Sequence, residues 1–412
     1  MEFTAMGPLA GIRVLDLSRI LAGPWASQVL ADFGADVLKV ERPGVGDDTR
    51  HWGPPYLRDH AGNSTAESAY YLGANRGKRS LAIDFTQPAG QALISDLARQ
   101  SDVLIENYKV GGLARYGLDY ARLSQLNAKL VYCSISGFGQ DGPRAAEAGY
   151  DAAIQALGGL MSITGEANGP PQKVGVAVAD LMTGMYAVAG VLAALRHAEA
   201  TGIGQHIDLA LLDTQVGWLA NQAMNYLVGG SVPVRKGSAH PNIVPYQVLP
   251  TADGHLMLAV GNDAQFRRCC AVLGQPTLAD DPHYANNAER VMHRDALIAV
   301  LSARLSTRSS AHWLARLSAE SVPCAPVNRI DEVFADAQVQ ARGLRFELPH
   351  PQSGSVPQVA NPLRFSATPI EYTQAPPLLG QHTAEVLRAR LGLDEQRIAA
   401  LAKAGVIGLC VE

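Results

Sequence analysis

The chain has 412 residues, of which 47% are hydrophobic and 17% charged, and its formal net charge is −4. This composition is typical of a soluble globular protein, and the length predicts two or three domains. The nearly balanced charge excludes a broad nucleic-acid-binding surface, so an anionic ligand must be bound by a few placed cations or by helix N-termini.

Several absences indicate where the protein works. The first residues show no basic segment followed by an apolar run, so we expect no secretory signal and a cytoplasmic location. The five cysteines show no C-x-x-C spacing, which fits a reducing compartment and predicts no metal site. The apolar run from Leu181 to Leu195 is shorter than the roughly 20 residues of a membrane span. We expect a buried helix that ends at Arg196 and His197, and no membrane partner.

The predicted elements of the first part of the chain alternate between strand and helix. Strands are expected at residues 12–17, 36–41, 102–106 and 129–135, and helices at residues 23–33 and 88–99. This alternation predicts an α/β fold with a parallel sheet, whose ligands bind at the carboxyl ends of the strands. The turn after the first strand lacks the G-x-G-x-x-G motif, and the chain has no P-loop motif, so the usual modes of dinucleotide and nucleotide binding are disfavoured.

The character of the chain changes near residue 229, where a Gly/Ser/Pro-rich stretch leads into two short strands and several helices. We therefore expect three parts. Residues 1–225 form a large Rossmann-like domain with a linker helix, residues 226–330 form a smaller α+β domain, and residues 331–412 return to the large domain.

Asp180 is the leading candidate for chemistry. It stands between the apolar run 174–179 and the helical pattern that begins at Leu181. A carboxylate at such a junction commonly accepts hydrogen bonds from the free N–H groups of the helix start. It can also attack an electrophile, and the rest of the chain decides between the two roles.

Several motifs, in order along the chain, resemble those of the class III CoA-transferase family, the CaiB/BaiF type. They are Gly11–Leu17, Gly34–Gly44, Asn75–Ser80, Glu106–Tyr108, Ser136–Pro143, Thr201–Gln205 and Pro377–Thr383. Each motif alone is weak, but together they cover nearly the whole chain. The resemblance implies an interlocked homodimer, in which each subunit has a Rossmann-like large domain completed by the C-terminal segment. This architecture agrees with the one expected from the alternation of strands and helices.

The resemblance places the family's nucleophilic carboxylate at Asp180. Such a carboxylate attacks an acyl-CoA thioester to form a mixed anhydride, becomes an aspartyl-CoA thioester, and passes CoA to a free carboxylic acid. The helix start after Asp180 and glycines of the smaller domain are expected to supply N–H donors to the tetrahedral intermediates.

Coenzyme A carries phosphates, so its site needs cations and backbone donors. The resemblance assigns its contacts to Ile20, Leu21, Ala22, Arg42, Ile83, Asn107, Tyr108 and Arg115. Of these, Arg42 and Arg115 are the expected phosphate ligands. A lysine of the family is replaced here by Thr86, so phosphate contacts are expected to differ and to involve Lys78 or Arg79.

Other reactions within the resemblance stay open. An α-methylacyl-CoA racemase needs an acid/base pair, and the His of its Gly-His-Asp segment is replaced here by Tyr150, a poor base at neutral pH. The formyl-CoA:oxalate type carries a glycine-rich loop where this chain has residues 236–247. A carnitine-type CoA-transferase is a further alternative. A CoA-binding scaffold protein without activity, in which Asp180 only caps the helix, is another.

The segments that distinguish the branches of the family favour dicarboxylic acids. Asp47–Pro55, Ile163–Gly165, Lys236–Gln247 and Gly261–Phe266 look most like the succinyl-CoA:glutarate (hydroxymethylglutarate) branch. The leading substrates are therefore succinyl-CoA as donor and a dicarboxylic acid as acceptor. The far carboxylate of such an acid needs a cation, for which Arg50, Arg76 and His240 are the candidates. The alternative for Arg50 and His240 is a role as local structural donors.

Overall fold

The computed structural model describes residues 7–410, which fold into two compact units. The larger unit contains the chain up to residue 160, residues 174–223 and the chain from residue 340, and the smaller unit contains residues 161–173 and 224–339. This division differs from the expected one because residues 161–173 belong to the smaller unit and the returning segment begins at residue 340. The first six residues, where a signal segment was sought, lie outside the described residues.

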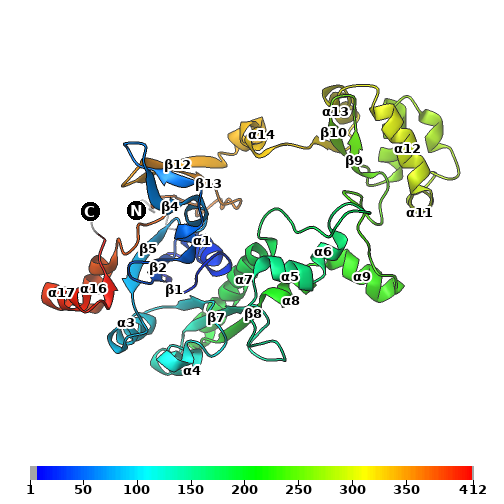
Figure 1. The fold of residues 1–412 in the computed structure, drawn as a ribbon. Helices are drawn as coiled ribbons and strands as arrows, with labels where there is room; N and C mark the ends of the chain where they lie inside the picture. Colours follow the sequence, from blue (N-terminus) through cyan, green and yellow to red (C-terminus); the bar gives the residue numbers. More distant parts are fainter. Residues whose placement is uncertain (1–6, 411–412) are drawn as a thin grey trace. The chain divides into compact units, whose positions relative to one another are not determined.

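The larger unit is built on a seven-stranded sheet (Figure 1). Its strands, in spatial order, are β14 (Ile407–Gly408), β5 (Lys78–Ile83), β2 (Asp36–Glu41), β1 (Arg13–Asp16), β6 (Val103–Glu106), β7 (Val131–Ser136) and β8 (His206–Ala210). All are parallel except the C-terminal β14, which pairs antiparallel with β5. In chain order the parallel strands run 3-2-1-4-5-6, as in doubly wound folds, and the order reverses between β1 and β6. The predicted parallel-sheet α/β core is confirmed.

Helices cover both faces of this sheet, which explains why its strands are apolar on both sides. Val14 and Val103 face α1 (Ala22–Asp32) and α7 (Val178–Thr201), whereas Leu15 and Leu104 face the opposite side. That side is covered by α3 (Pro88–Arg99), α4 (Tyr120–Leu126), α16 (Thr383–Leu391) and α17 (Glu395–Lys403). The other elements are α2 (Ala69–Leu72), α5 (Asp151–Leu157), α8 (Leu211–Gly217), and the hairpins β3 (Tyr56–Arg58) with β4 (Ser64–Ser68) and β12 (Arg345–His350) with β13 (Gly354–Val359).

Helix α7 has 24 residues and ends at Gly202, whose left-handed backbone (φ 77°) closes the last turn. The prediction that Arg196 and His197 end this helix was wrong, because both side chains lie on its exposed side, where charge is tolerated. By length and composition, α7 is the one helix within residues 7–410 that could cross a membrane. Its buried side packs in the core with α1 and the sheet, as predicted.

The smaller unit has a core of its own. Its antiparallel sheet contains β9 (Tyr246–Pro250), β10 (His255–Ala259) and β11 (Cys324–Pro326). Its helices are α10 (Asp263–Val272), α11 (Asn287–Met292), α12 (Arg294–Leu305), α13 (Ser310–Ala319) and α14 (Ile330–Ala335). The chain passes from one unit to the other within α6 (Leu160–Ile163), α9 (Ala220–Gly229) and α15 (Ala337–Ala341). Trp313 is fully buried in this core and donates its indole N–H to the carbonyl of Leu305 at 2.6 Å.

The surroundings of two glycines in α7 predict that their replacement by alanine changes the free energy of unfolding in opposite directions. A Cβ at Gly184 would lie 2.7 Å from the carbonyl oxygen of Ala22 in α1, whereas a Cβ at Gly190 would meet only Ile207, at 3.6 Å. We expect Gly184→Ala to lower the free energy of unfolding by about 1–3 kcal/mol, because α1 and α7 must separate. Gly190→Ala should raise it by up to about 1 kcal/mol, because alanine favours the helix. Urea unfolding checks both, and equal effects would contradict the close approach of α1 and α7.

Candidate active site

The turn after β1 lies at the switch point of the sheet, where the first and fourth parallel strands are neighbours. Residues 17–21 connect β1 to α1, and Asn107 follows β6 directly. Ile20 has a left-handed backbone (φ 72°), which a β-branched residue keeps only when its surroundings fix it. In open α/β sheets, ligands bind in the crevice at this place.

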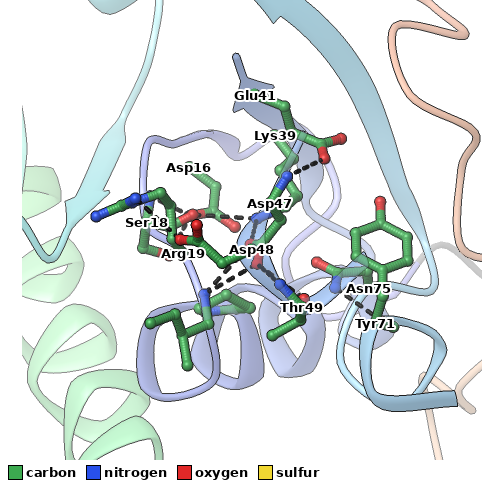
Figure 2. Close-up of polar contacts among 12 residues, drawn as sticks. Asp16, Ser18, Arg19, Lys39, Glu41, Asp47, Asp48, Thr49, Tyr71 and Asn75 are labelled. Atoms are coloured by element: carbon green, nitrogen blue, oxygen red, sulfur yellow. Dashed lines mark hydrogen bonds and ion pairs between the residues drawn. The ribbon is translucent and has the colours of Figure 1, made fainter. Parts of the chain in front are cut away.

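Three side chains fix the backbone of this turn, and we call Lys39, Asp47 and Asn107 the turn clamp. Asn107 binds both sides of Arg19, because its Oδ1 accepts the Arg19 N–H at 2.8 Å and its Nδ2 donates to the Arg19 carbonyl at 2.7 Å. Asp47 accepts the N–H of Ile20 at 3.2 Å. The ammonium of Lys39 donates to Asp47 at 2.8 Å and to the carbonyl that precedes Arg19 at 3.0 Å (Figure 2).

The clamp determines what the turn can bind. In dinucleotide-binding folds, N–H groups of this turn meet a pyrophosphate. Here the N–H groups of Arg19 and Ile20 are already bonded to side chains, which agrees with the missing glycine motif. Asn107, expected to contact CoA, uses its amide group to hold the backbone of Arg19.

Lys39 and Asp47 are fully buried, yet both are held in the charged state. Burial alone would raise the pKa of Asp47, but Lys39 and Thr49 lower it to about 2. Burial would lower the pKa of Lys39, but Asp47 and Asp16 raise it to about 12. The pair therefore stays ionised across the neutral range.

Two of the cations expected to bind substrate are occupied inside the protein. Arg50 is 3% exposed and forms ion pairs with Glu41 and Glu67, both at 2.7 Å. Arg76 is 5% exposed and pairs with Asp32 at 2.6 Å. A guanidinium that is already neutralised and buried has little left for a ligand, so we leave both out of the proposed substrate site.

The other expected cations also have internal partners. Lys78 is fully buried and donates to Asp16 at 3.3 Å, so it is closed to phosphate, and Arg79 is bonded to Asp36 at 2.6 Å. His240 lies in the smaller unit, where its Nδ1 accepts the N–H of Asn242 at 3.1 Å. Burial is the main cause that lowers the pKa of His240 below its ordinary value.

A cavity of about 550 Å³, which we call the large hollow, follows the carboxyl ends of β2 and β5 and the loop after β6. Four residues assigned to CoA line it: Arg42, Ile83, Tyr108 and Arg115. The exposed side chains of Arg42 and Arg115 suit phosphate groups. Phe85 and Tyr116 also line it and contact each other edge to face, 5.6 Å between ring centres. The sequence prediction missed these rings, although Phe85 lies two residues beyond the end of β5.

A second cavity of about 170 Å³, the small hollow, shares Arg19, Tyr108 and Lys109 with the large one. Its lining includes Asp180 and the remaining residues assigned to CoA, namely Ile20, Leu21, Ala22 and Asn107. The structure thus brings all the expected CoA residues to two adjoining hollows at the carboxyl edge of the sheet, with Asp180 in the smaller one.

Asp180 is the third residue of α7 and does not cap it. The cap is Asp151, at the start of α5, whose Oδ1 accepts the N–H groups of Ala179 at 2.8 Å and Asp180 at 3.4 Å. The carboxylate of Asp180 is therefore released from the role that such a position suggests. The same bonds occupy the N–H groups of Ala179 and Asp180. That N–H groups after Asp180 and glycines of the smaller unit stabilise tetrahedral intermediates stays a prediction.

The surroundings of Asp180 favour its protonated form more than water does. Burial, followed by the neighbouring carboxylate of Asp151, raises the pKa of Asp180 to about 7. Tyr150, which replaces the histidine of the racemases, lines the same hollow and is 63% exposed. A carboxylate in a crevice with so strongly shifted a pKa is a candidate for chemistry.

Two adjacent aspartates, Asp47 of the turn clamp and Asp48 next to it, should differ in how much their substitution lowers the free energy of unfolding. Asp47→Asn leaves the buried ammonium of Lys39 without its main counter-ion, and we expect it to lower the free energy of unfolding by about 3–5 kcal/mol. Asp48 pairs with Arg19 at the surface, where its side chain is 45% exposed, so Asp48→Asn should cost at most about 1 kcal/mol. Urea unfolding measures both; equal losses would show that the buried pair does not stabilise the fold.

Comparison with known proteins gives one consistent result. The profile of CoA-transferase family III matches residues 9–383. A succinate–glutarate CoA-transferase of Agrobacterium fabrum is 54% identical over 92% of this chain and 95% of its own, and the human succinyl-CoA:glutarate CoA-transferase is 43% identical over 97% and 90%. The crystal structure of a CaiB/BaiF family protein from Brucella suis covers 93% of this chain and all of its own, with 46% identity and a TM-score of 0.83. The chain therefore belongs to CoA-transferase family III, the CaiB/BaiF family of enzymes.

Proposed function

We propose that the enzyme transfers CoA from succinyl-CoA to a dicarboxylic acid such as glutarate, with Asp180 as the nucleophile. The observation that carries the proposal is the position of Asp180, whose carboxylate is spared from capping by Asp151 and lines the small hollow. The exposed cations of the adjoining large hollow suit the phosphates of CoA. The names of the similar enzymes from Agrobacterium fabrum and human support succinate and glutarate as the acids.

The chemistry follows from the arrangement. The Asp180 carboxylate attacks the thioester carbon of the donor and the C–S bond breaks. CoA leaves as a thiolate, and the donor acyl group remains on Asp180 as a mixed anhydride. The thiolate attacks the Asp180 carbonyl and releases the donor acid, which leaves an aspartyl-CoA thioester. The acceptor carboxylate displaces the thiolate from this thioester to form a second anhydride. Attack of the thiolate on the acceptor carbonyl yields the new acyl-CoA and frees Asp180.

We also propose that the enzyme works in the cytoplasm as an interlocked homodimer. Apolar side chains of α9 are exposed in the single chain, with Leu227 at 71% and Val228 at 80%. Neighbouring exposed apolar residues of this kind suit a protein interface.

Asp180→Asn should lower the rate of CoA exchange between succinyl-CoA and glutarate by more than about 1000-fold, since an amide is not a nucleophile. The cap of α7 comes from Asp151, so the variant should fold, which circular dichroism and thermal unfolding verify. Incubated with succinyl-CoA and no acceptor, the wild type should gain the mass of CoA less one water, and the variant should not. Unchanged exchange in a folded variant would refute the assignment of Asp180.

The pH dependence should report the carboxylate of Asp180. Because protonation removes the nucleophile, kcat/KM should fall as the pH drops through about 7. Asp151→Asn keeps an oxygen acceptor for α7 but removes a negative charge, so it should lower the pKa of Asp180 and move this fall to lower pH. Asp151→Ala should also lower the free energy of unfolding by about 1 kcal/mol, because the cap is lost. An unmoved profile in the Asn variant would show that Asp151 does not act on Asp180.

A further inference from the structure

Arg19 lies at the junction of the two hollows and is one of two cations that line both of them. Its side chain is 43% exposed, and Nη1 pairs with Asp48 at 2.9 Å. The guanidinium carbon lies 5.2 Å from the ring centre of Tyr108. The Nε group is buried and has no hydrogen-bond partner among residues 7–410. A buried donor without a partner costs stability, so the guanidinium is held in this place at some cost, with its exposed part open to the hollows.

Among the charged residues that line the small hollow, Arg19 is the cation whose backbone is fixed by another side chain. Glu147 is paired with Arg144 at 3.1 Å, so its charge is already matched. Lys109 lines both hollows too, but its side chain is exposed and flexible. Arg19 differs because its N–H and carbonyl groups are both fixed by Asn107. A donor group on a fixed backbone is pre-organised for a ligand.

Resting on the proposed function, we propose that Arg19 determines specificity by binding the charged far end of dicarboxylic substrates. The acyl group must lie in the small hollow for its carbonyl to meet Asp180, which places its far end among the residues that line that hollow. A guanidinium offers several N–H donors in one plane and suits a carboxylate. The exposed part of the guanidinium is the part that the bound carboxylate can reach.

The test compares glutarate with its half-amide, 5-amino-5-oxopentanoate, as acceptors. The two have nearly the same shape, but the half-amide has no charge at the far end. In a double-displacement reaction, kcat/KM for the acceptor reports only the second half-reaction, so the donor succinyl-CoA does not enter the comparison. The wild type should prefer glutarate. Arg19→Gln should lower kcat/KM for glutarate on the order of 10- to 100-fold, the value of a charge-assisted hydrogen bond, and leave that for the half-amide nearly unchanged.

Three further variants separate recognition from other roles of Arg19. Arg19→Lys keeps the charge and should retain part of the preference for glutarate. Asp48→Asn breaks the surface ion pair but keeps the guanidinium, so the preference should persist. Lys109→Gln removes one positive charge from the same two hollows, and it should reduce the preference much less than Arg19→Gln does.

Several outcomes would overturn the inference while leaving the proposed function intact. If Asp48→Asn reproduces Arg19→Gln, the arginine acts by holding the loop of Asp48. If Arg19→Gln raises KM equally for succinyl-CoA and acetyl-CoA without changing acceptor preference, the arginine binds a part of CoA common to both.

Other outcomes would overturn the proposed function. If the wild type exchanges CoA with neither acceptor, or Asp180→Asn remains active, the proposed function itself fails.

Discussion

The site depends on the buried ion pair between Lys39 and Asp47. These two residues belong to β2 and the loop that follows it, yet they hold the backbone of the turn after β1. Two opposite charges in a dry interior are favourable only when their geometry is good and their remaining hydrogen bonds are satisfied. Both conditions are met here, because Thr49 and the turn itself supply those bonds. The left-handed backbone of Ile20 is the conformation that this network maintains.

Asp180, the proposed nucleophile, is positioned by contacts from other helices. The missing side chain at Gly184 lets α7 approach the carbonyl of Ala22 in α1, one helical turn beyond Asp180. Asp151 of α5 binds the N–H groups at the beginning of α7 and adds a negative charge beside Asp180. The position of Asp180 thus follows from packing against α1, and its proton affinity from burial and from α5.

Sequence reasoning predicted those features that depend on periodicity and on motifs. The alternation of apolar segments predicted the parallel sheet, and the motif order placed the expected CoA residues around two hollows that adjoin one another. It could not predict which side chains pair with one another across the fold. The partners that neutralise Arg50 and Arg76 lie 9 and 17 residues away for Arg50, at Glu41 and Glu67, and 44 residues away for Arg76, so the sequence did not reveal these ion pairs. The cap of α7 was missed for the same reason, since Asp151 is 28 residues from Ala179.

The burial of Lys39 and Asp47 has a consequence for the effect of salt. Mobile ions screen charges at the surface within about 8–10 Å at physiological ionic strength, but they do not reach a pair that is closed to solvent. Arg42 and Arg115 are exposed, so the proposed binding of the polyanion CoA to them is the step that ionic strength should weaken. Lys39 and Asp47 are buried, so the shape of the turn beside Asp180 stays the same. On the proposed assignment, salt should slow the association of the substrate but leave the geometry of the turn unchanged.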